Sequence, residues 1–263
     1  MVSGDGVNRV AVVTGAARGI GAATVSALVD AGWSVLAVDA VCDDPALPYP
    51  MATKVELTDM ASERVQPYVA DVRDGGAMAE AVAVAEGLWG GVDAAIAVAG
   101  VIAGGVPFWE MPVERERAVL AVDLDGVLNL ARAAIPALLR RPAPRNGRFL
   151  AVASAAASRG LPMLAAYCAA KAGVVGFVRA LAVELGGTGI TANVVNPGST
   201  DTAILAESAR LYDLADPAVF ARQQPIGRLL DAREVADVLA FLAGPTGAAL
   251  TGAVVPVDGG LAI

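Results

Sequence analysis

The chain has 263 residues, of which 56% are hydrophobic and 17% charged, so it can bury a large core. Its net charge of −8, with no cluster of Lys and Arg, argues against nucleic acid or an anionic membrane as a partner. The absence of histidine excludes a Ser-His-Asp mechanism, and the two cysteines, Cys42 and Cys168, argue against a zinc site and suit a reducing cytoplasm.

Short β-branched runs alternate with long Ala-rich segments along the chain. The polar residues 1–8 do not resemble a signal peptide and are expected to form a flexible tail. Strands are predicted at 9–15, 33–39, 65–71, 92–100, 147–154, 190–198 and 253–260. Helices are predicted near 19–31, 75–89, 113–140, 163–185 and 231–243. Because near-continuous apolar strands are typical of parallel strands buried on both faces, we predict a single-domain, Rossmann-like α/β fold with a doubly wound sheet of about seven strands.

Two segments interrupt this alternation. Residues 40–64 contain three prolines and a mixed pattern in place of a simple crossover helix. Residues 199–230 form a long excursion after the sixth predicted strand. Ligands of open α/β sheets bind beyond the carboxyl ends of the strands, so the excursion is a candidate substrate lid, with a plain loop insertion as the alternative.

The segment TGAARGIG, residues 14–21, follows the first predicted strand and opens the first helix. Its three glycines lack β-carbons, so the backbone can turn sharply and approach a pyrophosphate, to which the helix N-terminus presents free N–H groups. A tight strand–helix turn without a ligand uses the same residues, but the position at this junction favours a dinucleotide site. We therefore assign Gly15, Gly19, Ile20 and Gly21 to cofactor binding.

Acidic residues at the ends of the next two strands indicate which dinucleotide binds. Asp39, eighteen residues beyond Gly21, can accept both ribose hydroxyls of an adenosine and would repel a 2′-phosphate, although a capping or loop aspartate is the alternative. No basic residue immediately follows Asp39, so NAD is favoured over NADP; Arg18, which could reach a phosphate, is the contrary feature. Asp71 and Val72 are candidates for contacts with the adenine edge.

The candidate catalytic residues lie in the second half of the chain. Ser154 ends the fifth predicted strand, and Tyr167 and Lys171 follow four residues apart in the segment AAYCAAKAG. On a helix this spacing places phenol and ammonium on one face, where the cation stabilises phenolate and lowers the pKa of the tyrosine from about 10. The pair can then donate and accept a proton, with Ser154 hydrogen-bonding the substrate oxygen, although Tyr-x-x-x-Lys alone occurs on many ordinary helices.

In combination, the glycine motif, Asp39 and the Ser154, Tyr167 and Lys171 spacing resemble the short-chain dehydrogenase/reductase (SDR) family over essentially the whole chain. The resemblance implies interconversion of a secondary alcohol and a ketone by Tyr-Lys-Ser acid/base catalysis, with hydride transfer to nicotinamide. The segment NPGSTDT, residues 196–202, is similar to the Pro-Gly segment of that family.

The resemblance also assigns roles in the nicotinamide pocket and exposes two departures. By resemblance, Pro197 and Gly198 shape the pocket and Thr202 contacts the carboxamide. The family usually has Asn-Asn-Ala-Gly after its fourth strand, whereas this chain has AVAG, in which Gly100 keeps close approach to the cofactor possible. Asp123 stands where the fourth catalytic residue of the family, an asparagine that helps hold a lysine-linked water, is expected.

Asp123 leaves three interpretations open. In the first, its carbonyl keeps the family role and its side chain adds an acid near Lys171, so the relay survives with altered pH dependence. In the second, the aspartate simply substitutes in a helix. In the third, catalysis is impaired and the chain is an NAD-binding sensor or scaffold, which the intact Ser154, Tyr167 and Lys171 argue against.

A narrower resemblance concerns the insertion DDPALPYPMAT, residues 43–53, after Asp39. It looks like the mycofactocin-coupled branch of the family, whose members are associated with tightly retained NAD that mycofactocin reoxidises. The resemblance implies that the segment folds over the adenosine side and slows escape of the cofactor. The alternative is that the segment is an ordinary proline-rich surface connection. In that case the enzyme uses NAD that exchanges freely.

Substrate and assembly are indicated more weakly. Residues 155–164, in which Arg159 is the only cation, are mostly apolar and favour a lipophilic alcohol or ketone. The apolar residues of the excursion expected at the pocket mouth are Leu205, Leu211, Tyr212, Leu214 and Phe220. The helix at 164–185 is apolar on nearly all sides and must be buried in its own fold or against another subunit. The family resemblance implies that the fourth and fifth helices pair between subunits, so we expect a homotetramer.

Overall fold

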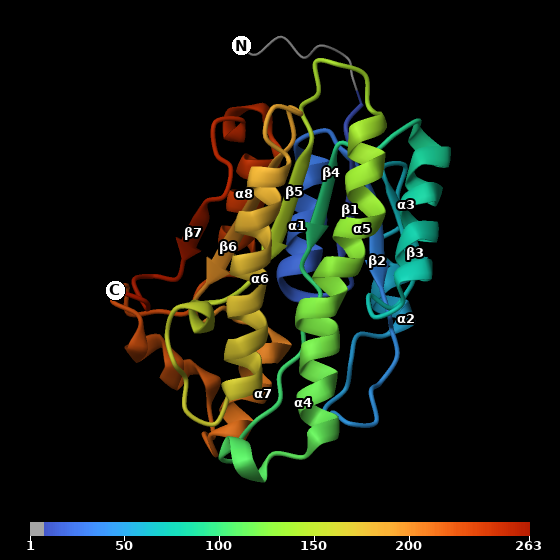
Figure 1. Ribbon diagram of the computed structural model, residues 1–263. Helices are drawn as coiled ribbons and strands as arrows, with labels where there is room; N and C mark the ends of the chain where they lie inside the picture. Colours follow the sequence, from blue (N-terminus) through green and yellow to red (C-terminus); the bar gives the residue numbers. More distant parts are fainter. Residues whose placement is uncertain (1–7) are drawn as a thin grey trace.

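The structure is a computed structural model that describes residues 8–263, so nearly all of the predicted tail lies outside the described residues. Its seven-stranded sheet is parallel throughout, in the order β3-β2-β1-β4-β5-β6-β7 (Figure 1). The strands are β1 (Val10–Thr14), β2 (Ser34–Asp39), β3 (Val65–Val69), β4 (Ala94–Ala97), β5 (Arg148–Val152), β6 (Thr191–Pro197) and β7 (Val254–Val257). The predicted doubly wound sheet is confirmed, with each strand shorter than its sequence pattern.

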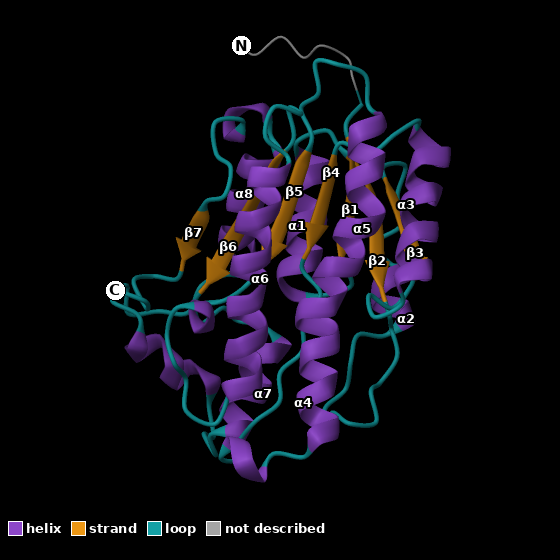
Figure 2. Cartoon of the chain, in the orientation of Figure 1, coloured by secondary structure: helices purple, strands orange, loops and turns teal. Residues whose placement is uncertain are grey.

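Helices cover both faces of the sheet (Figure 2). They are α1 (Gly19–Asp30), α2 (Lys54–Thr58), α3 (Gly75–Trp89), α4 (Val113–Leu120), α5 (Gly126–Arg140), α6 (Ala165–Glu184), α7 (Ala203–Leu211) and α8 (Ala232–Ala243). All five predicted helices are present, but the one expected at 113–140 is divided by a π-helical segment, Ala121–Asp125. α2 lies in the segment 40–64, and α7 and a 3₁₀ turn at Pro217–Gln223 lie in the excursion.

Alternation along each strand explains why the sheet has a core on both sides. In β1, Val10 and Val12 belong to the cluster under α3, α5 and α6, whereas Ala11 and Val13 belong to the cluster under α1 and α8. All four side chains have no exposed surface. Since successive side chains of a strand point to opposite faces, a strand buried on both faces must be apolar at every position, as the sequence pattern indicated.

Beyond the carboxyl ends of the strands lie further helices and long loops. In Figure 1 the strand arrows point down to α4, α7 and the long loops, which lie beyond the edge of the sheet. Two positions expected to end strands lie slightly outside them, because β3 ends at Val69 and β5 at Val152. Asp71 and Ser154 therefore stand on loops at this edge, where backbone groups freed from the sheet can contact a ligand.

α6 is long and apolar enough to cross a membrane by length and composition, but it lies against the sheet as a core helix. Val174 and Val178 face the main core, while a row of small residues along the opposite side, including Ala172 and Gly176, is exposed. The helix is therefore not buried all round within one chain. Contact of this face with another subunit stays a prediction.

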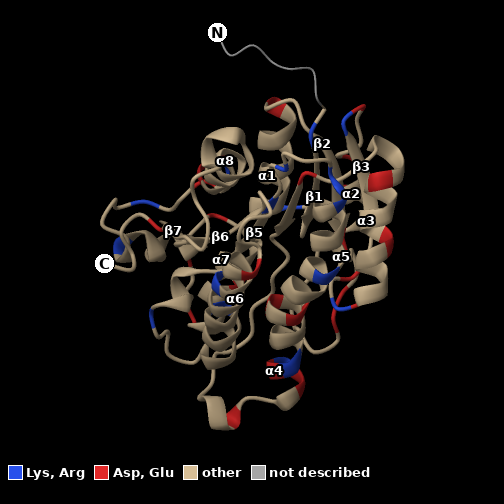
Figure 3. Ribbon diagram, turned by 45° about the horizontal axis from the view of Figure 1, so that its top comes forward, with Lys and Arg blue, Asp and Glu red and all other residues tan. Residues whose placement is uncertain are grey.

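Charged residues of both signs are interspersed over the outer elements, as on α4 in Figure 3. Arg228 and Glu234 form one such surface pair, with a shortest N–O distance of 2.6 Å. Exposed pairs of this kind contribute little to stability, because water screens the attraction between the charges. The fold is instead held by the two apolar clusters on either side of the sheet.

Candidate active site

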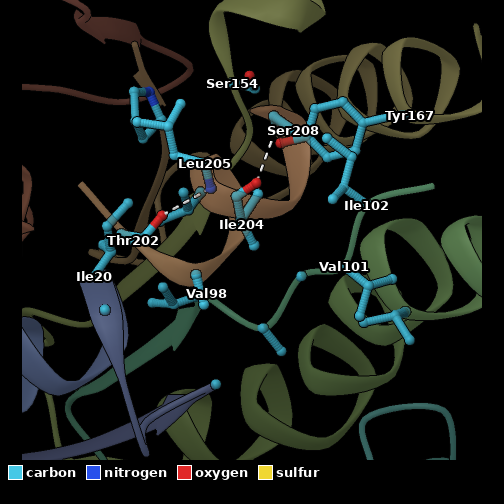
Figure 4. Close-up of a pocket in the computed structure, with 18 of the residues that line it drawn as sticks. Ile20, Val98, Val101, Ile102, Ser154, Tyr167, Thr202, Ile204, Leu205 and Ser208 are labelled. Carbon is cyan, nitrogen blue, oxygen red and sulfur yellow. Dashed lines mark hydrogen bonds between the residues drawn. The ribbon is translucent and has the colours of Figure 1, made fainter. Parts of the chain in front are cut away.

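A cavity of ≈ 820 Å³ opens at the carboxyl edge of the sheet. Every predicted site residue except Asp123 lines it: Gly15, Arg18, Gly19, Ile20, Gly21, Asp39, Asp71, Val72, Gly100, Ser154, Tyr167, Lys171, Pro197, Gly198 and Thr202. Residues far apart in the sequence are thus brought to one edge, as parallel βαβ units require. Figure 4 shows how side chains from α6, α7 and the loop after β4 converge on the cavity.

The loop after β1 is shaped to hold a pyrophosphate. Gly15 and Gly19 have φ values of +65° and +56°, which disfavour any residue with a β-carbon. A β-carbon at Gly15 would lie 2.6 Å from the Cα of Ala99, and one at Gly21 would overlap the carbonyl oxygen of Gly15. α1 has no side-chain cap at its N-terminus, so its first N–H groups stay free for an anion.

The carboxylate of Asp39 is oriented by the same loop. Its Oδ2 accepts the N–H of Ala17 at 3.0 Å, and its Oδ1 accepts the N–H of Val41 at 3.4 Å. A fixed carboxylate at the end of β2 is suited to a ribose diol. Arg18 was the one residue that favoured NADP, because it could bind a 2′-phosphate. Its guanidinium instead donates to the carbonyl oxygen of Pro50, in the insertion, at 3.1 Å.

Asp71 is held by Arg73 rather than left free for a ligand. The Arg73 guanidinium lies 2.6 Å from Asp71 Oδ2 and 2.5 Å from Asp44 Oδ2. Partial burial tends to raise the pKa of Asp71, but its hydrogen bonds with Arg73 outweigh burial and lower that pKa. Asp71 and Val72 line the cavity on the adenosine side, with Asp71 already ionised and paired.

Tyr167 and Lys171 lie on one face of α6, as their spacing predicted. Lys171 Nζ is 5.6 Å from the centroid of the Tyr167 ring and donates to the carbonyl oxygen of Val152 at 3.3 Å. Ser154 Oγ accepts the N–H of Ala156 at 3.1 Å, which leaves the hydroxyl proton free to donate into the cavity. The three groups needed to handle a proton at a substrate oxygen are therefore assembled.

The expected balance of effects on Tyr167 needs correction. Lys171 lowers the pKa of Tyr167, as predicted, and hydrogen bonding with Ser154 acts in the same direction. Burial, however, is the largest effect and raises the pKa above its ordinary value of 10.0, and Asp123 adds to the rise. The nearby cation alone predicts a lowered pKa, but burial of the phenol disfavours its charged form and outweighs the cation.

Asp123 does not line the cavity but lies directly beside Lys171. Its Oδ2 is 3.4 Å from Lys171 Nζ, and its Oδ1 accepts the N–H of Val101 at 2.7 Å. Asp123 has no exposed surface and Lys171 only 3%. The carboxylate of Asp123 therefore faces the ammonium of the predicted catalytic lysine, which favours a role for this side chain over an incidental helix residue.

The segment after β6, for which the family resemblance predicts contact with nicotinamide, forms another wall of the cavity. A β-carbon at Gly198 would lie 2.7 Å from the Cα of Asp258, so only glycine fits there. Thr202 caps α7, accepting the N–H of Leu205 at 3.4 Å and donating to the carbonyl oxygen of Thr200 at 3.2 Å (Figure 4). The methyl group of Thr202 lies over Gly19, where a β-carbon would come within 3.3 Å of it.

Residues 42–52, here called the strap, reach further than the adenosine side. Asp44 meets Arg73 at one end, while the Tyr49 hydroxyl accepts the N–H of Ile102 at 2.8 Å at the other. Leu47 is buried in the cluster that also contains Tyr167. Sequence reasoning missed these anchors, although Leu47 and Tyr49 are large apolar side chains in an otherwise proline-rich loop.

The substrate side is apolar with few polar groups. Of the five residues expected at its mouth, four line the cavity: Leu205, Tyr212, Leu214 and Phe220. Leu211 does not; it packs instead near Gly105, where a β-carbon would lie 3.3 Å from its Cδ2. Lining residues that sequence reasoning missed are Ile102, Ile204 and Ser208. Arg159 also lines the cavity and donates to the carbonyl oxygen of Leu261 at 2.7 Å.

Comparison with known proteins places these features in a family. A family model described as enoyl-(acyl carrier protein) reductase matches residues 15–262. The cis-4-hydroxycyclohexanecarboxylate dehydrogenase of Sinomonas cyclohexanicum is 37% identical over 255 residues, which cover 96% of each chain. The 2-dehydro-3-deoxy-L-rhamnonate dehydrogenase (NAD(+)) of a Sphingomonas species is 30% identical over 258 residues, which cover 98% of this chain and 97% of the relative.

A solved structure extends the similarity to three dimensions. Carveol dehydrogenase from Mycobacterium avium, in complex with NAD, matches with a TM-score of 0.91 and 29% identity over 98% of this chain and 99% of that one. The glycine loop, the strand-terminal Asp39 and the assembled Ser154, Tyr167 and Lys171 agree with this similarity. The chain therefore belongs to the short-chain dehydrogenase/reductase family.

Proposed function

We propose that this chain interconverts a lipophilic secondary alcohol and its ketone, using NAD and acid/base catalysis by Tyr167 with Lys171 and Ser154. The observation that carries the proposal is the convergence of these three side chains on an apolar cavity continuous with the glycine loop. NAD is the cofactor, and the free N–H groups at the start of α1 and the oriented carboxylate of Asp39 suit its pyrophosphate and adenosine ribose.

In the oxidative direction, Tyr167 as phenolate accepts the hydroxyl proton of the substrate while Ser154 donates a hydrogen bond to the same oxygen. NAD, when bound, accepts the hydride that leaves the carbinol carbon. Lys171 stabilises the phenolate, and its bond to the Val152 carbonyl oxygen holds the ammonium in place. In reduction Tyr167 returns the proton to the oxygen that forms.

The charge distribution of the cavity supports the substrate class. The acidic residues that line it, Asp39, Asp44 and Asp71, all lie on the adenosine side, and the substrate side is walled mainly by aliphatic and aromatic groups. Arg159 is a cation of that side, so an apolar ring with or without a carboxylate is compatible with it. Relatives named for carveol and for a hydroxycyclohexanecarboxylate support cyclic alcohols as the first substrates to test.

The test is reduction of NAD by the purified enzyme with a panel of cyclic secondary alcohols. We expect turnover with at least one of them and its loss in Tyr167→Phe, while Tyr68→Phe on β3 keeps wild-type activity. If no alcohol or ketone in the panel reacts but the protein binds NAD, the alternative of a catalytically impaired sensor or scaffold replaces this proposal.

The strap favours a second feature, retained NAD. We propose that the strap holds the dinucleotide between turnovers and that mycofactocin acts as the electron carrier that reoxidises it. Three anchors support the proposal: Arg73 to Asp44, Arg18 to the Pro50 carbonyl oxygen, and the Tyr49 hydroxyl to Ile102. We expect release of the cofactor to require movement of this segment, since Cys42, Asp44, Leu47, Met51 and Ala52 line the cavity.

Nucleotide released by denaturing the exhaustively dialysed protein tests retention. We expect close to one NAD per chain, and a lower content in Tyr49→Phe, which cannot accept the Ile102 N–H. Tyr68→Phe serves as the control with unchanged content. Nucleotide-free protein that turns over rapidly with added NAD would show that the cofactor exchanges freely, and the dehydrogenase proposal would still stand.

We further propose that the enzyme is a homotetramer of the cytoplasm, in keeping with its two unpaired cysteines, Cys42 and Cys168. The exposed row of small residues on α6 allows close approach of a second helix, and Val183 at its end is 81% exposed. Light scattering should give four chains for the wild type and fewer for Gly176→Glu, while Ala83→Glu on the exposed side of α3 leaves the assembly intact. A monomeric wild type would contradict the proposal.

A further inference from the structure

A carboxylate that the mechanism does not use lies beneath the proposed catalytic lysine. Asp123 sits on the π-helical segment between α4 and α5, where the wider turn directs its side chain toward α6. Its Oδ1 is satisfied by the N–H of Val101. Among residues 8–263, Oδ2 has no partner of hydrogen-bond geometry and faces Lys171 Nζ at 3.4 Å.

Both groups are almost fully buried, Asp123 behind the cavity and Lys171 at its wall. A β-carbon at Gly100 would lie 3.3 Å from Lys171 Nζ and 3.6 Å from Asp123 Oδ1, so the backbone of the loop after β4 covers both groups. Neither side chain has more than a few per cent of its surface exposed. Charges shielded from water in this way act on each other and on neighbouring groups more strongly than surface charges do.

The charged and titratable groups around the phenol come from several elements. Lys171 and Cys168 lie on α6 with Tyr167, and Asp123 lies on the π-helical segment. Tyr49, from the strap, packs against the apolar cluster that contains Tyr167. Ser154, on the loop after β5, is polar and neutral. Asp123 is thus the one carboxylate that acts on Tyr167 within this group, and it opposes the stabilisation of phenolate by Lys171.

We propose that Asp123 is a positioning residue that anchors the Lys171 ammonium and offsets its field at Tyr167, so that phenolate forms only under more alkaline conditions than a neutral residue at 123 would give. This inference rests on the proposed function and deepens it. Oxidation of an alcohol needs the phenolate, whereas reduction of a ketone needs the phenol. Near neutral pH, Asp123 therefore favours the state of the enzyme that donates a proton to a ketone.

The pH dependence of kcat/KM for alcohol oxidation tests this role in the holoenzyme with saturating NAD. Asp123→Asn removes the charge while its amide oxygen still accepts the Val101 N–H. We expect the limb on which activity rises with pH to move toward acid by about tenfold in proton concentration. Asp125→Asn, an exposed residue of the same π-helical segment, should leave the profile unchanged. A fall in kcat without movement of the limb would overturn the proposal.

Titration of tyrosinate absorbance gives a readout that does not depend on turnover. The difference between a protein and its Tyr167→Phe derivative isolates Tyr167, and we expect its midpoint at lower pH in the Asp123→Asn background than in the wild type. Asp123→Ser, a second neutral acceptor, should shift it in the same direction and serves if the amide variant folds poorly. Equal midpoints in all backgrounds would overturn the inference, whereas a wild type without turnover would overturn only the proposed function.

Discussion

The two edges of the sheet both bury basic side chains, but they use them differently. At the amino edge, Arg148 is fully buried and donates to the carbonyl oxygens of Gly147 and Gly244 at 2.9 and 3.4 Å. Arg9 donates to the carbonyl oxygens of Ala243 and Asn146, both at 2.9 Å. At the carboxyl edge, Lys171 has one carbonyl partner and one carboxylate partner beside a cavity.

The partners of a buried charge indicate whether it stabilises the fold or takes part in catalysis. A guanidinium that donates to backbone carbonyls on several loops ties those loops together, and its charge is neutralised by fixed dipoles. Burial still lowers the pKa of Arg9 to about 10 and lowers that of Arg148, which shows that desolvation is incompletely offset at both. The ammonium of Lys171 has one backbone partner and lies between Tyr167 and Asp123, so it acts on a titratable phenol and is itself opposed by a carboxylate.

The largest effect that would sharpen this contrast is expected from removing both charges at the carboxyl edge. Lys171→Met combined with Asp123→Asn should leave the melting temperature unchanged or raised, since replacing a buried ion pair by neutral groups is often neutral or stabilising. Turnover should fall by about 10²–10⁴-fold, the usual contribution of acid/base catalysis. Melting curves and steady-state rates measure both. A variant that loses much stability but keeps full activity would show that the charges at the carboxyl edge are structural.

At the amino edge we expect the opposite pattern. Arg148→Met leaves buried carbonyl oxygens without a donor, at a cost of about 1–3 kcal/mol for each unsatisfied group. Unfolding in urea should show a loss of about 2–4 kcal/mol, with kcat of the folded enzyme unchanged. Arg132→Met, on the exposed side of α5, is the matched control and should alter neither. Normal stability of Arg148→Met would show that the buried guanidinium is dispensable.

A third prediction concerns a neutral residue whose hydrogen bonds join two segments at the carboxyl edge. Gln224 is buried in the excursion; its Oε1 accepts the Ser199 N–H at 2.8 Å, and its Nε2 donates to the Arg228 carbonyl oxygen at 2.6 Å. Gln224→Leu should weaken NAD binding about tenfold, because a lost hydrogen bond of about 1.4 kcal/mol loosens the segment that follows Pro197. Calorimetry measures the affinity, with Gln66→Leu, at an exposed position of β3 that does not line the cavity, as control. Unchanged affinity would show that the excursion does not order the nicotinamide side.

The smallest effect is expected at the exposed ion pair between Arg228 and Glu234. Arg228 and the N–H of Asp231 lower the pKa of Glu234 from 4.5 to about 2. A carboxyl group whose pKa falls on folding contributes stability that is complete above pH 4.5 and is lost as the pH falls toward about 2. Glu234→Gln should lower the melting temperature at pH 7 by no more than about 2 °C. The gap between variant and wild type should close in acid; a constant gap would contradict the ionic origin.

How much of the site could be predicted depended on the range of the interactions. The glycine loop follows from local rules, since residues 14–21 must turn sharply from a strand into a helix, and the structure has that turn with its glycines closely packed. Tyr167 and Lys171 are one helical turn apart, and helix geometry alone brings them to one face. The Tyr49 to Ile102 bond joins residues 53 apart in the chain, and no local pattern predicts such a pairing.

The sequence by itself determined the succession of strands and helices along the chain, the strands apolar on both faces, the glycine turn and the placement of a phenol and an ammonium on one helix face. These follow from backbone geometry and from short runs of apolar residues, which act over a few positions. Only the tertiary structure decided how deeply Tyr167 is buried, that Asp123 faces Lys171, and that the strap reaches Ile102. Desolvation and long-range charge depend on what packs around a group, and that is settled only when distant segments meet.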